Sequence, residues 1–240
     1  MPDSSQPTPW TVQGEDKRVA VRSMFAEIAG TYDRVNGLMS FNQHNAWRAA
    51  AIKRLDLKPG ESVLDVCCGT GDFLIPAQKA VGESGRVTGI DFCEPMLRQA
   101  GPKLNGAARL SVADACALPF ASAQFDAVTI GWGLRNVPDM PLALKEMARV
   151  LKPGGRIAIL DMARPRGPLG PIIEKVTQSG LPMLGKLIGK SSAYTYLPKS
   201  ILTFASREEI AKRMEEAGFT NVRMKDFCFG NICLHWAERQ

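Results

Sequence analysis

The sequence predicts an α/β fold in which helices cover both faces of a doubly wound, mainly parallel sheet. Short apolar runs typical of buried strands alternate with helical patterns between residues 63 and 160. The first run, residues 63–66, breaks into the turn Gly69-Thr70-Gly71 and then opens a helix. Ligands of such sheets bind at the carboxyl ends of the strands, so this turn predicts the place of a site.

The N-terminal part is predicted to be a disordered tail followed by helices. Residues 1–15 are rich in Pro, Ser and Thr. A helix is expected from Asp16, because apolar residues recur at helical spacing on one face, namely Val21, Met24, Phe25 and Ile28. Residues 48–55 predict another helix, which a Lys-Pro-Gly turn separates from the first strand.

Strands and helices then alternate along the rest of the chain. The expected strands are 63–66, 86–90, 109–112, 125–130, 156–160, 222–227 and 232–236. The expected helices are 73–81, 94–101, 142–151 and 206–218, the last with Ser206 as its N-cap. Four successive strands end at or near a residue suited to ligand binding. Three of these residues are acidic, namely Asp65, Asp91 and Asp114, and the fourth is Gly131.

One segment interrupts this alternation. Its apolar residues lie at helical spacing and predict two short helices laid over the site as a cap: Ile172, Ile173, Val176, Leu184, Leu187 and Ile188. Residues 164–199 hold six basic side chains against Glu174 alone, so they carry +5 of the net charge of +6. Such charge suggests nucleic acid or lipid headgroups as a partner, although a solvated helix face explains it equally well.

The composition excludes several classes of protein. With 240 residues, 45% hydrophobic and 22% charged, the chain suits one soluble domain. No apolar run approaches the roughly 20 residues of a membrane span, and the polar N-terminus does not resemble a signal peptide. Six cysteines without a Cys-x-x-Cys pair and only two histidines predict reduced thiols, no metal site and a cytoplasmic setting.

The turn after the first strand predicts a nucleoside cofactor. Asp91 lies at the spacing that catches ribose hydroxyls in nucleotide-binding units. A dinucleotide fingerprint needs a third glycine, but residues 72–74 read Asp-Phe-Leu. The Asp72 carboxylate would repel a pyrophosphate, whereas it suits a sulfonium and an ammonium, and Asp65 can hold that cationic end. We therefore expect S-adenosylmethionine rather than NAD; glycines that serve packing alone are the alternative.

Several motifs are specific enough to resemble one family. The run Leu-Asp-Val-Cys-Cys-Gly-Thr-Gly-Asp at 64–72 resembles motif I of class I methyltransferases. The pattern Tyr-Asp-x-x-Asn-x-x-Met-Ser-x-x-x-His-x-x-Trp at 32–47 resembles the first signature of the quinone-biosynthesis C-methyltransferases, and 149–155 resembles the start of their second. The runs 133–137 and 234–235 also agree. This family comprises the demethylmenaquinone methyltransferases and the 2-methoxy-6-polyprenyl-1,4-benzoquinol methylases.

The chain departs from the family pattern at three places. Cys67 occupies the slot of the first glycine of motif I, which could shift the turn. The second signature usually continues into Glu and Ser, whereas Asp161, Met162 and Ala163 follow here. Gly131 stands where relatives often have Ser. These departures bear on substrate choice rather than on the class of reaction.

The resemblance implies a Rossmann-like fold with seven strands, the last antiparallel, and one domain over 16–240. Within it, 16–57 would form a helical lid and 164–199 the cap. S-adenosylmethionine would be bound by eight residues, Asp65, Gly69, Thr70, Gly71, Asp91, Asp114, Ala115 and Gly131. Asp91 would accept from the ribose hydroxyls and Asp114 from the adenine amine, while the Ala115 amide would face a ring nitrogen. Asp65 could instead cap local amides, and Asp114 could lie in a solvated loop.

The implied reaction is C-methylation of a reduced, prenylated quinone, a step of menaquinone or ubiquinone biosynthesis. Arg135, supported by Asn136 and Tyr32, would orient a water and stabilise the phenolate; a structural ion pair is the alternative for Arg135. His44 is a further base candidate that could equally hydrogen-bond locally, and a structural role is favoured for His235. The cap would admit the isoprenoid tail and touch the inner face of the membrane, and a homodimer stays open.

Two rival readings remain at this stage. A nucleic-acid methyltransferase would share the fold and the basic charge, but it should carry an Asn/Asp-Pro-Pro-aromatic stretch where residues 131–136 read Gly-Trp-Gly-Leu-Arg-Asn. We therefore expect no nucleic-acid partner. A non-catalytic module that senses cofactor or lipid is the second rival, and the intact glycines and Asp91 argue against it. The sequence leaves the choice between naphthoquinol and benzoquinol open.

Overall fold

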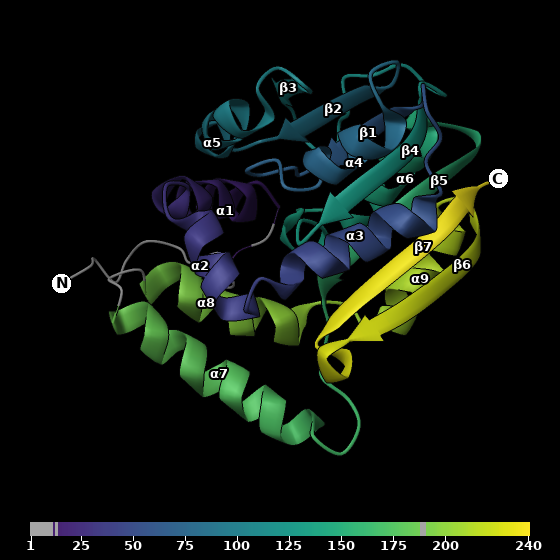
Figure 1. The fold of residues 1–240 in the computed structure, drawn as a ribbon. Helices are drawn as coiled ribbons and strands as arrows, with labels where there is room; N and C mark the ends of the chain where they lie inside the picture. The colour runs from purple at the N-terminus through teal and green to yellow at the C-terminus, as the bar shows by residue number, and fades with distance from the viewer. Residues whose placement is uncertain (1–11, 13, 188–190) are drawn as a thin grey trace.

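A seven-stranded sheet forms the centre of the protein (Figure 1). The structure, a computed structural model, describes residue 12, residues 14–187 and residues 191–240. The strands are β1 (Ser62–Val66), β2 (Arg86–Asp91), β3 (Arg109–Val112), β4 (Phe125–Gly131), β5 (Leu151–Met162), β6 (Phe219–Phe227) and β7 (Ile232–Arg239). Their order is β3-β2-β1-β4-β5-β7-β6, and β7 runs antiparallel to β5 and β6. The predicted fold class is confirmed.

Helices cover both faces of this sheet. One face packs against α3 (Gln43–Leu55), α4 (Leu74–Val81) and α5 (Glu94–Leu104). The other face packs against α6 (Met140–Val150) and α9 (Arg207–Glu216). In β1, Val63 belongs to the first core and Leu64 to the second, and both are fully buried. Successive strand residues point to opposite faces, which explains why buried parallel strands read as continuous apolar runs.

The N-terminal helices differ from the prediction at their ends. The helix α1 (Gly14–Ile28) buries Val21, Met24 and Ile28, as its apolar face predicts. The predicted tail falls mostly outside the described residues, but Gly14 and Glu15 already belong to α1. The sequence missed α2 (Tyr32–Ser40) and the first turn of α3. Phe41 and Asn42 separate these helices through left-handed backbone, φ 49° and 59°, without the glycine or proline that usually marks such a break.

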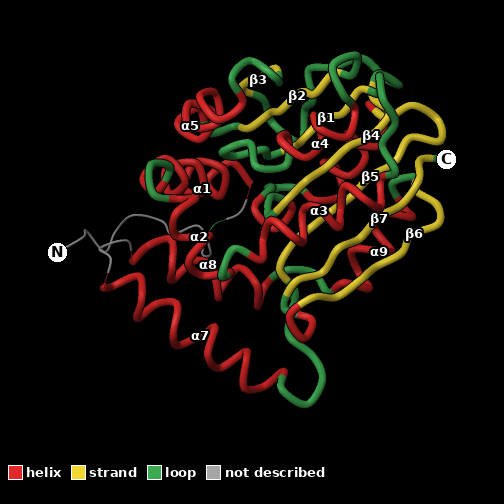
Figure 2. Tube along the Cα trace, viewed as in Figure 1, coloured by secondary structure: helices red, strands yellow, loops and turns green. Residues whose placement is uncertain are grey.

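The predicted cap consists of two helices, but they are longer than expected. They are α7 (Gly170–Leu187) and α8 (Ser191–Thr203), of 18 and 13 residues. Figures 1 and 2 show them with α1 and α2 beyond the carboxyl ends of the parallel strands. Ile188 lies outside the described residues, as do the side chains of Leu184 and Leu187. The cap is therefore positioned to cover whatever binds at the strand ends.

Smaller differences concern where elements begin. β5 begins at Leu151, so the Lys-Pro-Gly-Gly run expected as a turn lies inside the strand. The helix α6 begins two residues early, because the Asp139 side chain accepts a hydrogen bond from the Leu142 amide as its N-cap. Two short 3₁₀ helices, η1 (Leu134–Asn136) and η2 (Cys228–Gly230), occupy turns after β4 and between β6 and β7.

Candidate active site

The turn after β1 holds Asp91 in a fixed orientation. The Gly69 amide donates to Asp91 Oδ2 at 2.9 Å, and the Cys93 amide donates to Oδ1 at 2.8 Å. Gly69 has φ +55°, which aims its amide at the neighbouring strand end. Cys67, in the slot of the expected glycine, adopts the same left-handed φ of 55°. Burial raises the pKa of Asp91 to about 6 despite both amide bonds.

A cleft lies at the carboxyl ends of the strands, and we call it the strand-end cleft. It measures about 620 Å³ with its opening to solvent included. Five predicted cofactor residues line it: Gly69, Asp91, Asp114, Ala115 and Gly131. Side chains that sequence analysis missed complete the wall, among them Arg18, Phe25, Phe92, Met96 and Trp132. They come from α1, from α5 and from the loops after β2 and β4, and only the tertiary fold brings these elements together.

The N-terminal helix closes the strand-end cleft at Asp114. Arg18 of α1 lies 3.0 Å from Asp114 Oδ2, and the Cys116 amide donates to Oδ1 at 2.8 Å. Lys17 of the same helix donates to the carbonyl oxygens of Arg135 and Val137, at 3.2 and 3.0 Å. Asp114 is therefore held by α1 rather than placed in a solvated loop.

Two residues of the glycine turn do not line the strand-end cleft. A Cβ on Gly71 would lie 3.1 Å from the Ala100 Cβ and 3.3 Å from Leu104 Cδ1, so this glycine allows α5 to pack closely. Gly71 lines neither this cleft nor the two neighbouring spaces described below. Thr70 is buried, and its hydroxyl donates to Asp33 Oδ1 of α2 at 2.5 Å. Gly71 therefore has the packing role that was given as the alternative to cofactor binding for these glycines.

A second pocket adjoins the cleft, and we call it the charged pocket. It shares Gly69, Gly131 and Trp132 with the strand-end cleft, and Asp65, Thr70, Asp72 and Arg48 also line it. Asp65 is 1% exposed and accepts a hydrogen bond from the Thr129 hydroxyl at 2.7 Å. Burial raises the pKa of Asp65 to about 7, since this one hydrogen bond offsets only part of the lost hydration.

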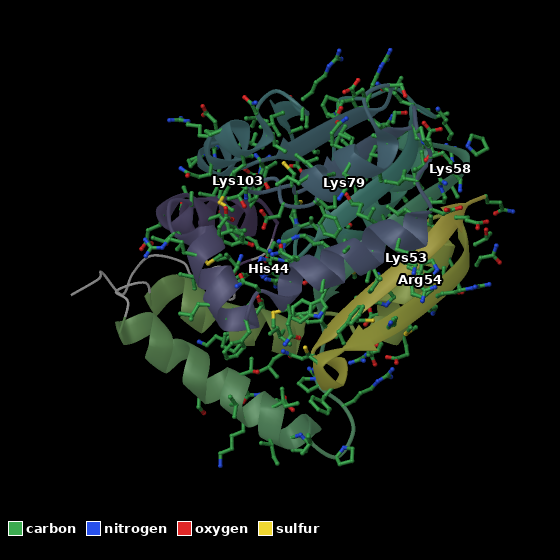
Figure 3. All side chains as sticks on the ribbon, in the orientation of Figure 1. His44, Lys53, Arg54, Lys58, Lys79 and Lys103 are labelled. Atoms are coloured by element: carbon green, nitrogen blue, oxygen red, sulfur yellow. The ribbon has the colours of Figure 1, made fainter. Side chains whose placement is uncertain are left out.

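The expected role of Asp72 is wrong in one respect. Its carboxylate does not present a free negative charge, because Arg48 lies 3.1 Å from Oδ2 and Lys103 pairs with Oδ1. Lys103, which is labelled in Figure 3, comes from α5, and Arg48 comes from α3. The sequence shows the acid beside the turn, but not the two cations that helix packing brings to it.

A third and larger space, which we call the apolar cavity, lies under the N-terminal helices and the cap. It measures about 1530 Å³ with its opening included. Apolar side chains from five helices and from the sheet edge line it, among them Met24, Ile28, Met39, Trp47, Met162, Val176, Leu197 and Ile232. Phe25, Tyr32 and Trp132 line both this cavity and the strand-end cleft, so the two spaces meet at these rings.

The predicted catalytic residues meet near this junction, but they face different spaces. Arg135 lines the apolar cavity and forms a buried ion pair with Asp161 at 2.5 Å. Asn136 lines the strand-end cleft; its amide donates to the Trp132 carbonyl at 2.9 Å and accepts from the Tyr196 hydroxyl at 2.7 Å. Tyr32 lines all three spaces, and burial raises the pKa of its hydroxyl. The structural ion pair that was the alternative role for Arg135 is present. Its acidic partner, Asp161, is one of the residues at which the chain departs from the second family signature.

The two histidines occupy different surroundings. His44 lines the apolar cavity, with Nδ1 2.5 Å from the Ser40 hydroxyl. Figure 3 shows it at the end of α3 near α2, whereas Lys53 and Arg54 lie toward the opposite end of that helix. Burial, followed by the charge of Arg48, lowers the pKa of His44. His235 lines none of the three spaces and forms a hydrogen bond of 2.9 Å with the Arg207 carbonyl.

Comparison with known proteins identifies the family. Residues 11–239 match the model of the ubiE/COQ5 methyltransferase family. The chain belongs to this family. It is 44% identical to demethylmenaquinone methyltransferases of Staphylococcus aureus strains such as JH9 and Newman, over 92% of this chain and 93% of theirs.

Solved structures share the fold of this family member at lower identity. A SAM-dependent methyltransferase of Thermotoga maritima superimposes with a TM-score of 0.67 at 19% identity, over 92% of this chain and 100% of that one. One from Aquifex aeolicus gives 0.59 at 24% identity, over 80% and 89%. Phosphoethanolamine N-methyltransferase 2 of Haemonchus contortus, solved with S-adenosyl-L-methionine, gives 0.59 at 17% identity, over 81% and 52%.

The family confirms the main functional predictions. The protein is a methyltransferase of the ubiE/COQ5 family, and the choice of S-adenosylmethionine over NAD is confirmed with it. Within the described ranges, no helix is both long and apolar enough to cross a membrane.

Proposed function

We propose that this protein transfers a methyl group from S-adenosylmethionine to a ring carbon of a prenylated quinol, with demethylmenaquinol as the first substrate to test. One observation carries the proposal: an apolar cavity of about 1530 Å³ meets the strand-end cleft at Tyr32 and Trp132. Such a cavity suits an isoprenoid chain with an aromatic ring at its inner end. The name of the Staphylococcus aureus relatives agrees with this substrate.

The cleft has the donors and acceptors that the cofactor needs. Asp91, fixed by two backbone amides, would accept from the ribose hydroxyls, and Asp114 with Ala115 would face the adenine. Gly69 and Gly131 line both the cleft and the charged pocket, and Asp65 supplies a carboxylate in the charged pocket. When bound, S-adenosylmethionine supplies an electrophilic methyl group on a sulfonium.

Arg135 is proposed to hold the oxygen of the quinol ring. Loss of a proton from a ring hydroxyl makes the adjacent carbon nucleophilic, and a nearby cation stabilises the resulting phenolate. Asp161 fixes Arg135 at the wall of the apolar cavity, and the Nε of Arg135 is buried without a hydrogen-bond partner among the described residues. Asn136 and Tyr32 would support this position and an ordered water, and His44, whose lowered pKa keeps it neutral, is the second group that could take the proton.

We propose that α1–α3 form the lid of a single domain over residues 16–240. Contacts from Lys17 to the Arg135 and Val137 carbonyls, and from Thr70 to Asp33, join the lid to the sheet. A closed lid excludes water from a reaction in which opposite charges are neutralised. Bound cofactor should therefore protect the lid from proteolysis.

Contact with a lipid surface is proposed for the mouth of the apolar cavity. Six of the large exposed apolar side chains lie on α2, α7, η2 and their ends: Leu38, Phe41, Leu169, Ile172, Val176 and Phe229. Phe41 is 83% exposed, and it lines the apolar cavity together with Val176, which is 64% exposed. This apolar rim supports insertion into a bilayer more directly than charge does, since Arg166 of the basic segment is paired with Asp226 and Glu208.

The rim can be tested with vesicles. The variant Phe41→Ser should co-sediment less with liposomes than the parent, while a change of the exposed Val19 on α1 to Ser serves as the control. Equal loss in both variants would contradict a role for the rim. A cytoplasmic location at the inner membrane face and a homodimer are also proposed; cell fractionation and light scattering measure them.

The deciding experiment is methyl transfer from radiolabelled S-adenosylmethionine to two acceptors under reducing conditions. One acceptor is a demethylnaphthoquinol and the other a methoxy-polyprenyl-benzoquinol. Label in the organic phase with either acceptor supports quinol methylation, and the ratio gives the ring preference. A lack of label with both, at saturating cofactor, would refute the proposed substrate class.

A further inference from the structure

Tyr196 lies where the cap, the lid and the loop after β4 meet. It belongs to α8, is 3% exposed, and packs with apolar side chains of α1. It also lines the apolar cavity, and its helix contacts η1, the turn that carries the predicted catalytic residues Arg135 and Asn136. One residue of the cap therefore connects the space proposed for the substrate with the segment that holds these two side chains.

The hydrogen bonds of the Asn136 side chain have a defined direction. The Trp132 carbonyl can only accept, so the Asn136 Nδ2 that lies 2.9 Å from it is the donor. The Oδ1 of the same amide then faces the Tyr196 hydroxyl, which donates to it at 2.7 Å. Burial raises the pKa of this hydroxyl to about 12, so it keeps its proton at neutral pH. Because the two bonds use opposite ends of one amide, they fix the orientation of its plane.

The same carbonyl joins Asn136 to Arg135. Arg135 Nη1 donates to the Trp132 carbonyl oxygen at 2.9 Å and pairs with Asp161. The two predicted catalytic side chains therefore share one backbone acceptor. Members of such a buried network depend on one another, so a displaced Asn136 amide would alter the surroundings of the Arg135 guanidinium.

The lid and the cap hold this segment by different groups. Lys17 of α1 donates to the backbone carbonyls of Arg135 and Val137, at 3.2 and 3.0 Å, whereas Tyr196 of α8 binds the Asn136 side chain. η1 has three residues, and so short a 3₁₀ helix has few hydrogen bonds of its own. Contacts from the neighbouring elements therefore set its position.

We propose that Tyr196 is a positioning residue for methyl transfer. Its hydroxyl orients Asn136 and, through the shared Trp132 carbonyl, keeps Arg135 in place, so the reaction requires α8 to lie against η1. This role needs no contact between the hydroxyl and the substrate. The inference rests on the proposed function, because it is there that Arg135 and Asn136 are assigned to the quinol.

The first test is the steady-state kinetics of Tyr196→Phe, which removes the hydroxyl and keeps the ring. We expect kcat for the better of the two quinols to fall roughly fivefold to a hundredfold, the effect of leaving a buried polar group without its partner. The KM for the quinol should change little, because the ring that lines the cavity is retained. Ser200→Ala is the matched control and should keep the parent kcat, since this buried hydroxyl of α8 donates within its own helix, to the Leu197 carbonyl.

A double-mutant cycle shows whether the effect passes through Asn136. In the Asn136→Ala background, Tyr196→Phe should cause no further loss of kcat, because the acceptor of its hydrogen bond is already absent. An equal loss in both backgrounds would overturn the proposal. So would a Tyr196→Phe protein with a parent-like melting temperature and an unchanged kcat.

Hydrogen exchange separates this inference from the proposed function. The backbone amides of residues 133–137 should exchange faster in Tyr196→Phe than in the parent or in Ser200→Ala, whether or not a quinol is the substrate. If the parent methylates neither quinol, the proposed function fails, and faster exchange in this segment would still support the contact from the cap. Unchanged exchange there would overturn the positioning role.

Discussion

Replacement of Asp65 by asparagine tests the electrostatics of the charged pocket in the free protein. Burial raises the pKa of this carboxyl from its ordinary 3.8 to about 7. The folded protein then holds the proton more tightly than the unfolded chain does. The contribution of Asp65 to the free energy of unfolding should therefore be most favourable below about pH 4. It should fall as the pH rises toward about 7 and level off above that value.

The magnitude follows from the width of that interval. Each unit between the unfolded and folded pKa values corresponds to about 1.4 kcal/mol of unfolding free energy. Between about pH 5 and about pH 8 the parent should lose roughly 3 kcal/mol through this group, whereas Asp65→Asn should not. Asparagine keeps an oxygen that can accept from the Thr129 hydroxyl, so the comparison isolates the charge.

The assay is urea unfolding of the cofactor-free proteins, followed by tryptophan fluorescence at several pH values and constant ionic strength. The parent and the variant should differ little near pH 5 and progressively more, in favour of the variant, up to about pH 8. Asp56→Asn is a control, because this exposed carboxyl has a pKa lowered by Lys58 and should give a curve parallel to the parent above about pH 5. A constant difference between Asp65→Asn and the parent over this range would refute the reasoning.

Three further predictions concern neighbouring groups. Cofactor affinity should rise as the pH increases through about 6, the raised pKa of Asp91, and this rise should vanish in Asp91→Asn; a flat calorimetric profile for the parent would contradict it. Gly131→Ser should lower the free energy of unfolding in urea by roughly 1–3 kcal/mol, because its Cβ would lie 2.5 Å from the Phe73 ring. Phe73→Leu should recover part of that loss. An equal loss with Phe73 and with Leu at that position would exclude this clash as the cause. Asp161→Asn should lower the free energy of unfolding by roughly 3–5 kcal/mol, because it leaves Arg135 buried and unpaired. Adding Arg135→Met should restore stability but not methyl transfer. If the double variant is no more stable than the single one, the ion pair is not the source of the loss.

Much of the fold and part of the site could be predicted from the sequence. The strands β1, β2, β4 and β5 contain buried apolar runs, and parallel pairing brings Asp65, Asp91 and Gly131 to one edge. The lid was harder to predict, because Phe41 and Asn42 break the helices through left-handed backbone without a glycine or a proline. Local spacing therefore predicts the sheet better than it predicts helices whose ends depend on tertiary packing.

The partners of the charged residues could not be predicted in the same way. The resemblance selected Arg135, but not Asp161 as the acid that fixes it. The glycine turn drew attention to Asp72, but not to Arg48, which adjoins the N-terminal signature and carries the unpaired donors of the pocket. In both cases the decisive quantity is a distance across packed elements.

By itself, the sequence determined the class of fold, the edge of the sheet where the site lies and the kind of cofactor, because these follow from residue patterns along the chain: the alternation of strands and helices, the glycine turn after the first strand and the acid that ends the second. Only the tertiary structure decided which charges are neutralised. Asp72 is compensated by Arg48 and Lys103, while Asp65 and two donors of Arg48 keep unused capacity in the same pocket. Coulombic and hydrogen-bond energies fall steeply with separation and depend on burial, and both are properties of the packed chain.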